Sequence, residues 1–317
     1  MQTPALEYLR HGQIPFYRLP NGPDVVANAD CAILGVPTDA GTTYQPGARL
    51  APYHVRRVSA LVQSYHPVHE IDVFSRLRCV DGGNVVFPPF DREIMRAAVE
   101  AEVRQLAAAL VKPIIVGGDH SVSLPVMRAL AKRHGPLACV HFDAHLDTST
   151  PDVWGDAFHH GTFMRHAIDE GLVEQGQLYQ LGIRGPRGAA SDADLVRSRE
   201  HSIFSADDIA ERSPKRVCAE LRERIGTRPL YITFDVDAID PAYAPGTGTP
   251  VPGGISAREA LQLIRGLAGC NVVGGDLVEF CPPLDHSDIT AHLSANLVWE
   301  MLAIMALAKR DSRPRLA

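Results

Sequence analysis

The sequence predicts an α/β fold with a mostly parallel central sheet and helices on both faces. Short apolar runs that suit buried strands alternate along the chain with longer segments of helical periodicity. Polar and acidic residues stand directly after four of these runs, where parallel strands present their carboxyl ends. No internal repeat, low-complexity linker or change of composition divides the 317 residues, so we predict one domain, 1–317.

The elements follow in order after an N-terminal arm, 1–28, which is rich in Pro, Gly and Asn and is expected on the surface or on a partner subunit. Pro37 closes the first apolar run, and Pro52 suits the first turn of a helix. Asp91 and Ser121 are expected to cap helices, and Gly135 to end one. Strands are expected at 31–37, 78–86, 113–121 with its Gly-Gly turn, 137–142, 178–183, 202–204, 229–234 and 272–278. Helices are expected at about 52–63, 91–110, 121–135, 160–170, 192–199, 214–225, 256–267 and 287–308.

Composition narrows the class of protein. Apolar residues make up 45% and charged residues 21%, and the net charge of −6 comes without a Lys/Arg tract, so nucleic acid is not an expected partner. The six cysteines are dispersed without a CxxC pair, which favours reduced core thiols. The N-terminus lacks the pattern of a signal peptide, and the apolar runs break before the ~18 residues of a membrane span. We therefore expect a cytoplasmic, soluble protein.

The stretch Val140–Thr148, VHFDAHLDT, alternates polar with apolar residues. If the segment is extended, this period of two puts its imidazoles and carboxylates on one face. Such a row is costly to bury unless a positive charge neutralises it, so a divalent metal is the natural candidate. A solvated strand edge is the alternative interpretation.

Other strand ends supply more groups of the same kind. The candidate ligands are two imidazoles and four carboxylates without a thiolate: His120, Asp143, His145, Asp147, Asp235 and Asp237. Four negative charges balance two divalent cations, and oxygen-rich sites with some nitrogen suit Mn²⁺ better than a structural zinc. Two ions need shared ligands, and they lower the pKa of a water between them. Each motif taken singly has an alternative interpretation. GGDH is usually a turn, and DxD is common by chance. His141 is expected to be a structural neighbour of the site and not a ligand.

The motifs together resemble those of the ureohydrolase family, which includes arginases, agmatinases and guanidino-acid hydrolases. The resemblance extends from about Leu34 to Ala306. It is carried, in the family's order, by GGDHS (117–121), HFDAHLDT (141–148), HHGT (159–162), FDVDAIDPAYAPGTGTP (234–250) and DLVEF (276–280). It implies an arginase-like three-layer α/β/α sandwich, two Mn²⁺ ions and hydrolysis of a guanidino group to urea and an amine.

The resemblance also implies roles for individual residues. One ion is held by His120, Asp143, Asp147 and Asp235, and the other by Asp143, His145, Asp235 and Asp237. Asp143 and Asp235 are the shared ligands. Glu279 matches the acid that anchors the guanidinium, with an ion-pair partner behind the site as the alternative. His160 matches the proton shuttle and also contacts substrate, whereas its neighbour His159 is less favoured. Asp147 is counted with Glu279 and His160 as catalytic.

The substrate is less determined. Arginases carry Ser-Gly-Asn in the loop before the catalytic histidine and an acid after the next strand. This chain has TSTPDVWGDAFHHG (148–161) and GIRGPRG (182–188), so arginine is disfavoured. The first loop resembles those of guanidino-acid hydrolases, and Val153 and Trp154 are predicted to line the pocket for the substrate's tail; for Trp154 the alternative is packing of the loop. The chain departs from the family's commoner residues at Leu50-Ala51, Phe280-Cys281 and Leu284.

Agmatine is the first substrate choice, followed by 4-guanidinobutanoate, 3-guanidinopropanoate, a proclavaminate-type acid or another small guanidine. Ni²⁺ is the alternative metal. A homotrimer or homohexamer is expected from the family. A non-catalytic partner subunit and a single-zinc, deacetylase-like amidohydrolase are the alternative classes; the first predicts the loss of a metal position, and none is lost.

Overall fold

The computed structural model describes residues 14–88, 90–188 and 191–309. Its centre is an eight-stranded sheet in the order β4-β1-β5-β10-β9-β6-β7-β8, in which every neighbouring pair is parallel. The strands are β1 (Cys31–Gly35), β4 (Cys79–Asn84), β5 (Lys112–Val116), β6 (Leu137–Phe142), β7 (Val173–Ile183), β8 (Ser202–Ser205), β9 (Pro229–Asp235) and β10 (Asn271–Val278). Most of them are buried along their length, as the continuous apolar runs predict.

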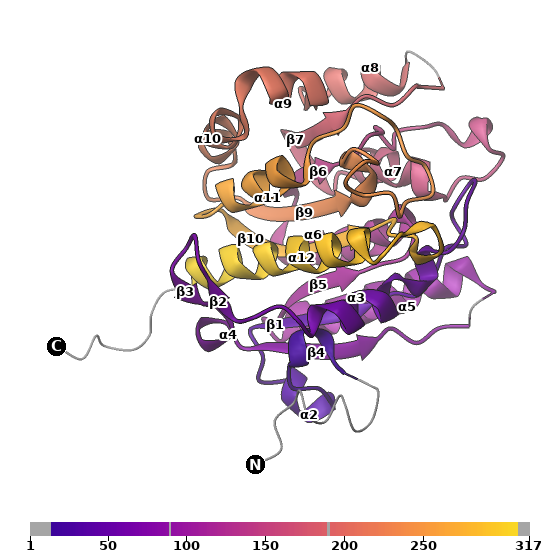
Figure 1. The fold of residues 1–317 in the computed structure, drawn as a ribbon. Coiled ribbons are helices and arrows are strands. Elements are labelled where there is room, and N and C mark those ends of the chain that lie inside the picture. The colour runs from indigo at the N-terminus through magenta and orange to yellow at the C-terminus, as the bar shows by residue number, and fades with distance from the viewer. Residues whose placement is uncertain (1–13, 89, 189–190, 310–317) are drawn as a thin grey trace.

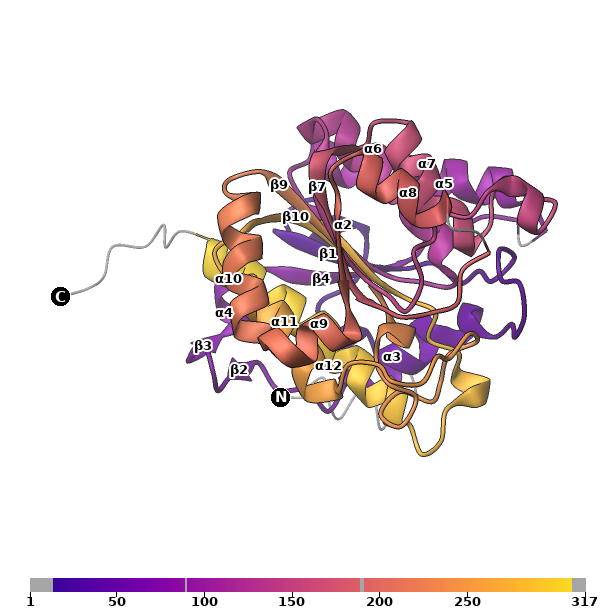
Figure 2. The ribbon, with the colours of Figure 1, turned by 90° about the horizontal axis from the view of Figure 1, so that it is seen from above.

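Helices cover both faces of the sheet, so the predicted three-layer α/β/α sandwich is confirmed (Figures 1 and 2). One face carries α5 (Arg92–Ala108), α6 (Ser123–His134) and α7 (Phe163–Asp169). The other carries α3 (Ala51–Ser59), α9 (Ala206–Arg212), α10 (Pro214–Ile225), α11 (Ala257–Gly266) and α12 (Ile289–Ala308). The remaining α-helices of the described residues are α2 (Pro23–Val26), α4 (Val73–Arg76) and α8 (Ser191–Ser198). Each face has its own apolar core.

Local sequence explains several boundaries. The Asp91 carboxylate accepts from the backbone N–H groups of Glu93 and Ile94 and caps α5, as predicted. Pro52 lies in the first turn of α3. The expected cap at Ser121 is wrong. Ser121 lies inside the 3₁₀ turn His120–Val122, and Asp119 caps that turn by accepting from Ser121 N–H. This extra turn moves His120 to the start of the helical segment.

Two regions differ from the elements expected. The segment between α3 and β4 contains a short antiparallel hairpin, β2 (Tyr65–His66) and β3 (Ile71–Asp72), followed by α4. Its strands of two residues are too short to leave a periodic signal. The helix expected at 160–170 divides into the 3₁₀ turn His160–Thr162 and α7.

The described part of the N-terminal arm packs on the chain's own core. Phe16 is fully buried, and its N–H donates to the Asp81 carboxylate over 2.9 Å. The Tyr17 hydroxyl donates to the Ala295 carbonyl in α12 over 2.6 Å. Residues 1–13 lie outside the described part of the arm.

α12 is rich in apolar residues along its length. In length and composition it is the one helix of the described residues that meets the requirements of a membrane span. Inside the protein, 72% of its most apolar window is buried, and it packs against α3, α11 and β10. It is therefore a core helix.

The sheet order places the expected site at the middle of one edge. The four strands followed by candidate ligands are β5, β10, β9 and β6, and these are consecutive neighbours at the centre of the sheet. Because all of them are parallel, their carboxyl ends meet. Residues that lie more than 150 positions apart in the chain, such as His120 and Glu279, thus come within hydrogen-bonding distance.

Candidate metal centre and active site

His120 lies at the centre of one group of ligand atoms. Its Nδ1 atom is 3.1 Å from an Asp143 oxygen, 3.1 Å from an Asp147 oxygen and 3.3 Å from an Asp235 oxygen. His120 is fully buried, and this Nδ1 atom has no hydrogen-bond partner among the described residues. Four of the predicted ligands are therefore brought together around one buried nitrogen.

A second group forms around His145. Its Nδ1 atom is 3.0 Å from an Asp237 oxygen and 3.3 Å from Asp143 Oδ1. Asp143 belongs to both groups, since its other oxygen, Oδ2, faces His120. Asp235 is placed in the first group, and its Oδ1 accepts from Asp237 N–H over 2.7 Å. Its predicted sharing between two ions therefore stays a prediction.

The spacing of these donor atoms fits divalent ions. Around an ion with bonds of about 2.1 Å, neighbouring ligand atoms are separated by roughly 3.0–3.4 Å. The separations of 3.0–3.3 Å between the imidazole nitrogens and the carboxylate oxygens match that range. An orphaned buried nitrogen facing three carboxylates is also the arrangement that a cation would complete. The residues present thus fit a pair of metal ions.

His141 supports the site from behind. Its Nε2 atom is 2.8 Å from Asp143 Oδ2, and its Nδ1 is 3.0 Å from the Gln180 amide nitrogen. Because the amide donates to Nδ1, the proton of a neutral His141 is on Nε2 and is donated to Asp143. His141 lies within the same cluster of metal-ligating side chains as His120. Both of its nitrogens are nevertheless engaged, which agrees with its exclusion from the predicted ligand set.

The electrostatics show the need for positive charge. Burial and the charges of Asp237 and Asp143 raise the pKa of Asp235 well above its usual value. Burial opposes the charged form of His145, but Asp237 and Asp143 raise its pKa to about 12. Without a metal, the crowded carboxylates thus favour protons on Asp235 and on His145, and a divalent ion that binds here displaces such protons.

His160 and Glu279 form a pair beside the two groups of candidate metal ligands around His120 and His145 (the metal groups). His160 Nδ1 is 2.9 Å from Glu279 Oε1, and that oxygen also accepts from His120 N–H over 2.8 Å. On its other side, His160 Nε2 is 2.8 Å from the Thr43 hydroxyl. Burial lowers the pKa of His160, but the Glu279 carboxylate outweighs it and raises the pKa to about 9.

His159 differs from its neighbour. Burial and the charge of His160 lower its pKa to about 4. Its Nδ1 accepts from Gly161 N–H over 3.1 Å, so it serves as a cap for the turn. An imidazole that is neutral at pH 7 has no proton to spare for a leaving group. Of the two histidines, His160 is the one suited to proton transfer.

Two of the predicted site residues have strained backbones. Asp147 has φ 52° and Glu279 has φ 60°, the left-handed region that side chains with a Cβ rarely adopt. Such strain costs on the order of 1–3 kcal/mol and persists where the surroundings enforce it. Here the Glu279 N–H donates to the Gly118 carbonyl over 2.9 Å, and a Cβ at Gly118 would lie 1.7 Å from the Thr38 carbonyl oxygen. Close backbone packing thus fixes where Glu279 points.

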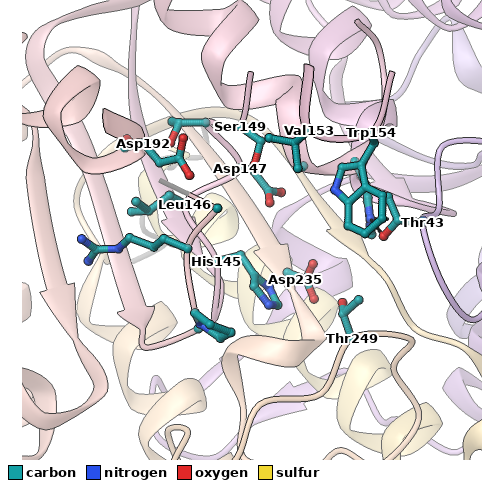
Figure 3. Close-up of a pocket in the computed structure, with 17 residues that line it drawn as sticks. Thr43, His145, Leu146, Asp147, Ser149, Val153, Trp154, Asp192, Asp235 and Thr249 are labelled. Carbon is teal, nitrogen blue, oxygen red and sulfur yellow. Dashed lines mark hydrogen bonds between the residues drawn. The ribbon is translucent and has the colours of Figure 1, made fainter. Parts of the chain in front are cut away.

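A cavity of about 360 Å³ opens onto the metal groups. Figure 3 shows His145, Asp147 and Asp235 gathered together, with Val153 and Trp154 coming from the loop after β6. Six predicted site residues line the cavity: His145, Asp147, Val153, Trp154, His160 and Asp235. His120, Asp143, Asp237 and Glu279 are absent from its wall and lie behind it. Val153 and Trp154 are exposed at 43% and 62%, which places them at the mouth.

Sequence reasoning missed other residues of the cavity wall, among them Thr43, Arg187, Asp192 and Thr249. Thr43 comes from the loop after β1, which ends at the same edge of the sheet as the metal groups. Its position directly after a strand was the one feature of the sequence that could have indicated Thr43 as a site residue.

Arg184, which stands where arginases have an acid, points elsewhere. Its guanidinium donates to the backbone carbonyls of Asp237, Ala238 and Val251, so it holds together the loops behind the site. It is absent from the cavity wall, which Arg187 of the same loop joins instead.

Comparison with known proteins agrees with this arrangement. The model of the family described as "Arginase family" matches residues 29–303. The chain belongs to the Arginase family. It is 39% identical to the proclavaminate amidinohydrolase of Streptomyces clavuligerus over 302 residues, which cover 95% of this chain and 96% of the relative. It is 40% identical to the guanidinopropionase of Pseudomonas aeruginosa over 303 residues and 95% of each chain.

A third relative of this Arginase family member is the agmatinase of Photorhabdus laumondii, 39% identical over 298 residues that cover 93% of this chain and 94% of the relative. The solved structure of the Streptomyces proclavaminate amidinohydrolase aligns with a TM-score of 0.89 over 94% of this chain and 99% of that one. The protein is thus an enzyme that hydrolyses C–N bonds of linear amidines. The match supports this activity over the deacetylase-like alternative. Because the three relatives are almost equally similar to this chain, the comparison does not show which of their substrates this enzyme uses.

Proposed function

We propose that this enzyme hydrolyses the guanidino group of a small substrate other than arginine to urea and an amine, at a centre for two Mn²⁺ ions. The observation that carries the proposal is Asp143, whose two oxygens face two different groups of imidazole and carboxylate ligands. A ligand shared by two ions has this geometry. Ni²⁺ is the alternative metal, because imidazole and carboxylate ligands suit both ions.

The metal ligands divide into two sets that meet at Asp143. His120, Asp147 and Asp235 would complete the first set, and His145, Asp237 and Asp235 the second. When bound, two divalent ions lower the pKa of a water molecule, so that hydroxide forms near neutral pH. His141 and Thr249 hold ligand orientations, since they contact Asp143 at 2.8 Å and Asp237 at 3.2 Å.

Glu279 is the proposed anchor for the guanidinium of the substrate. A carboxylate can pair with two guanidinium N–H groups at once, which orients the planar group. Its Oε1 atom is engaged by His120 N–H and His160, whereas Oε2 has no hydrogen bond to the described residues. The alternative role, an ion-pair partner of His160 behind the site, is favoured by its 2% exposure and by its absence from the cavity wall.

His160 is the proposed donor of the proton that the leaving amine requires. It lines the cavity, and its raised pKa of about 9 keeps it protonated at neutral pH. The Thr43 hydroxyl, 2.8 Å from Nε2, holds the ring from the cavity side. The Glu279 carboxylate at Nδ1 favours the charged form of the ring.

The charged residues at the cavity mouth indicate which charge the substrate's tail carries. The sequence places agmatine first, and Asp192 in the wall is an acid that could face its ammonium. Asp192, however, is only 4% exposed, whereas Arg187 is exposed and is the one Lys or Arg among the described residues of the wall. A cation at the mouth attracts a carboxylate tail and repels an ammonium tail. This contrast favours a guanidino acid, with Val153 and Trp154 packing on its methylene groups.

A urea-release screen tests the proposal. Protein loaded with Mn²⁺, and separately with Ni²⁺, is assayed with agmatine, 3-guanidinopropanoate, 4-guanidinobutanoate and arginine. We expect the highest kcat/KM for a guanidino acid and the lowest for arginine. An Arg187→Gln variant should lose about tenfold in kcat/KM for the acid, since each 1.4 kcal/mol is tenfold, and little for agmatine. Protein that holds two metal ions but releases no urea from any of the four would overturn the proposal.

The chain is also proposed to act in the cytoplasm as a homotrimer or homohexamer. Light scattering coupled to size-exclusion chromatography gives the assembled mass, and a monomeric result would contradict this assembly.

A further inference from the structure

Asp276 is a buried carboxylate that has no part in the proposed reaction. It lies in β10, three residues before Glu279, and is 0% exposed. Its contacts are three hydroxyl groups, which all donate to it. Thr233 reaches Oδ1 over 2.6 Å, Ser123 reaches Oδ2 over 2.6 Å, and the Tyr231 hydroxyl makes a short bond to Oδ2. No Lys, Arg or His among the described residues forms an ion pair with it.

Burying such a charge without a cation is costly, and three hydroxyl donors lower that cost without removing it. Replacing a buried charge together with its partners by apolar groups of similar volume is often neutral or stabilising. Stability alone therefore does not explain why a carboxylate is buried here.

Thr233 links Asp276 to the metal groups. The Thr233 oxygen is 2.8 Å from His120 Nε2 and 2.6 Å from Asp276 Oδ1. A hydroxyl has one proton to donate, and an ionised carboxylate only accepts. The Thr233 proton therefore goes to Asp276, and its oxygen accepts from His120. This assignment puts the ring proton of His120 on Nε2.

The other ring nitrogen is then left with its lone pair. His120 Nδ1 faces oxygens of Asp143, Asp147 and Asp235 at 3.1–3.3 Å and has no hydrogen bond. In the neutral form of the ring, which is the form that binds a metal, this lone pair is aimed at three carboxylates and suits a cation placed between them. Groups behind a ligating histidine commonly fix its tautomer in this way, and their loss costs 10–100-fold in metal affinity.

We propose that Asp276 is a positioning residue which, through the Thr233 hydroxyl, holds His120 with its Nδ1 lone pair directed at a divalent metal ion. The inference rests on the proposed metal centre. Its effect is confined to one of the two ions, because no such chain reaches His145 from the residues that the structure describes. Gly185 packs against the His145 ring, whose side chain is 28% exposed.

The experiment measures metal binding, not turnover alone. Metal-free wild type and the variants Asp276→Asn, Thr233→Val and Thr233→Ser are titrated with Mn²⁺, following free Mn²⁺ by electron paramagnetic resonance. Ser123→Ala is the matched control, because it removes one hydroxyl donor from the same carboxylate without breaking the chain to His120. Circular dichroism and thermal melting of each metal-free protein establish that it folds.

We expect Asp276→Asn and Thr233→Val to weaken one of the two Mn²⁺ sites by about 10–100-fold and to leave the other site unchanged. Thr233→Ser and Ser123→Ala should bind both ions as the wild type does. If Asp276→Asn does not fold, the comparison of Thr233→Val with Thr233→Ser carries the test by itself.

Two results would overturn the inference. Two unchanged Mn²⁺ sites in folded Thr233→Val would show that the chain is not needed. Equal weakening in Ser123→Ala would show a general packing effect. Wild type that binds fewer than two ions would instead contradict the proposed function, so the two failures are distinguishable.

Discussion

Among the residues that the structure describes, two clusters of histidine and carboxylate lie in the interior, and one of them suits a metal better than the other. Around His120 and His145, four carboxylates meet two imidazoles, and no arginine or lysine of the described residues forms an ion pair with them. The other cluster consists of His66, His69 and Glu300. There, Arg265 donates to Glu300 Oε1 over 2.7 Å and supplies the missing positive charge.

The histidines of the two clusters are also held in opposite ways. His66 Nδ1 accepts from two backbone N–H groups at 3.1 and 3.2 Å, so its Nε2 carries the proton that it donates to Glu300 at 2.9 Å. No lone pair of His66 is left for a metal. His120 has its Nε2 tied to Thr233 and its Nδ1 unpaired. Residue type alone does not make a metal site; the local charge balance and the free lone pair do.

The strongest test of this contrast removes the shared carboxylate. Asp143→Ala deletes a ligand of both groups, so we expect loss of bound metal and of urea release to below detection. Elemental analysis of the purified variant measures the metal content. A variant that keeps two ions per chain would contradict the shared role of Asp143.

Glu279→Gln should separate metal binding from turnover. Both ions are expected to stay, because Glu279 is no predicted ligand, while kcat/KM for the best guanidine falls about 10²–10³-fold as a charge-assisted contact is lost. Metal content and urea release are measured on the same sample. Near-normal activity would show that the substrate does not need this carboxylate.

The pH dependence of metal binding gives a smaller, graded effect. The carboxylates raise the pKa of His145 to about 12, so an entering ion must displace a proton that is present at neutral pH. Apparent Mn²⁺ affinity should therefore rise with pH, by up to about tenfold per unit for each proton displaced. Titrations of metal-free protein at several pH values check this, and an affinity that falls as the pH rises would contradict it.

The smallest effect on activity is expected at the second cluster. Arg265→Met leaves the buried Glu300 charge without its cation and should destabilise the protein by about 3 kcal/mol. Metal content and urea release at 25 °C should be unchanged. Thermal melting measures the loss, and a variant that gains or loses bound metal would show that the two clusters are not distinct.

The sequence predicted the fold well because its signals are local. Continuous apolar runs and helical periods alternate, and the four runs followed by acids or imidazoles proved to be the adjacent strands β5, β10, β9 and β6. The hairpin β2–β3 was missed because its strands of two residues leave no period to detect.

The candidate site was predicted in part. The alternation in Val140–Thr148 singled out Asp143, His145 and Asp147, and the structure places all three at the metal groups. Arg187 and Thr43 were not found, since a loop residue enters the cavity wall only through the path of its backbone. Arg184 shows the converse: its position in the chain drew attention, yet it binds loop carbonyls.

By itself, the sequence determined the alternating architecture, the kinds of ligand and their positions at strand ends, because strand period and apolar burial are properties of neighbouring residues. Tertiary structure alone decided which oxygen of Asp143 faces which histidine, and which buried carboxylates receive a positive partner. Those outcomes depend on distances between strands far apart in the chain, as when Asp276 in β10 reaches His120 through Thr233 of β9.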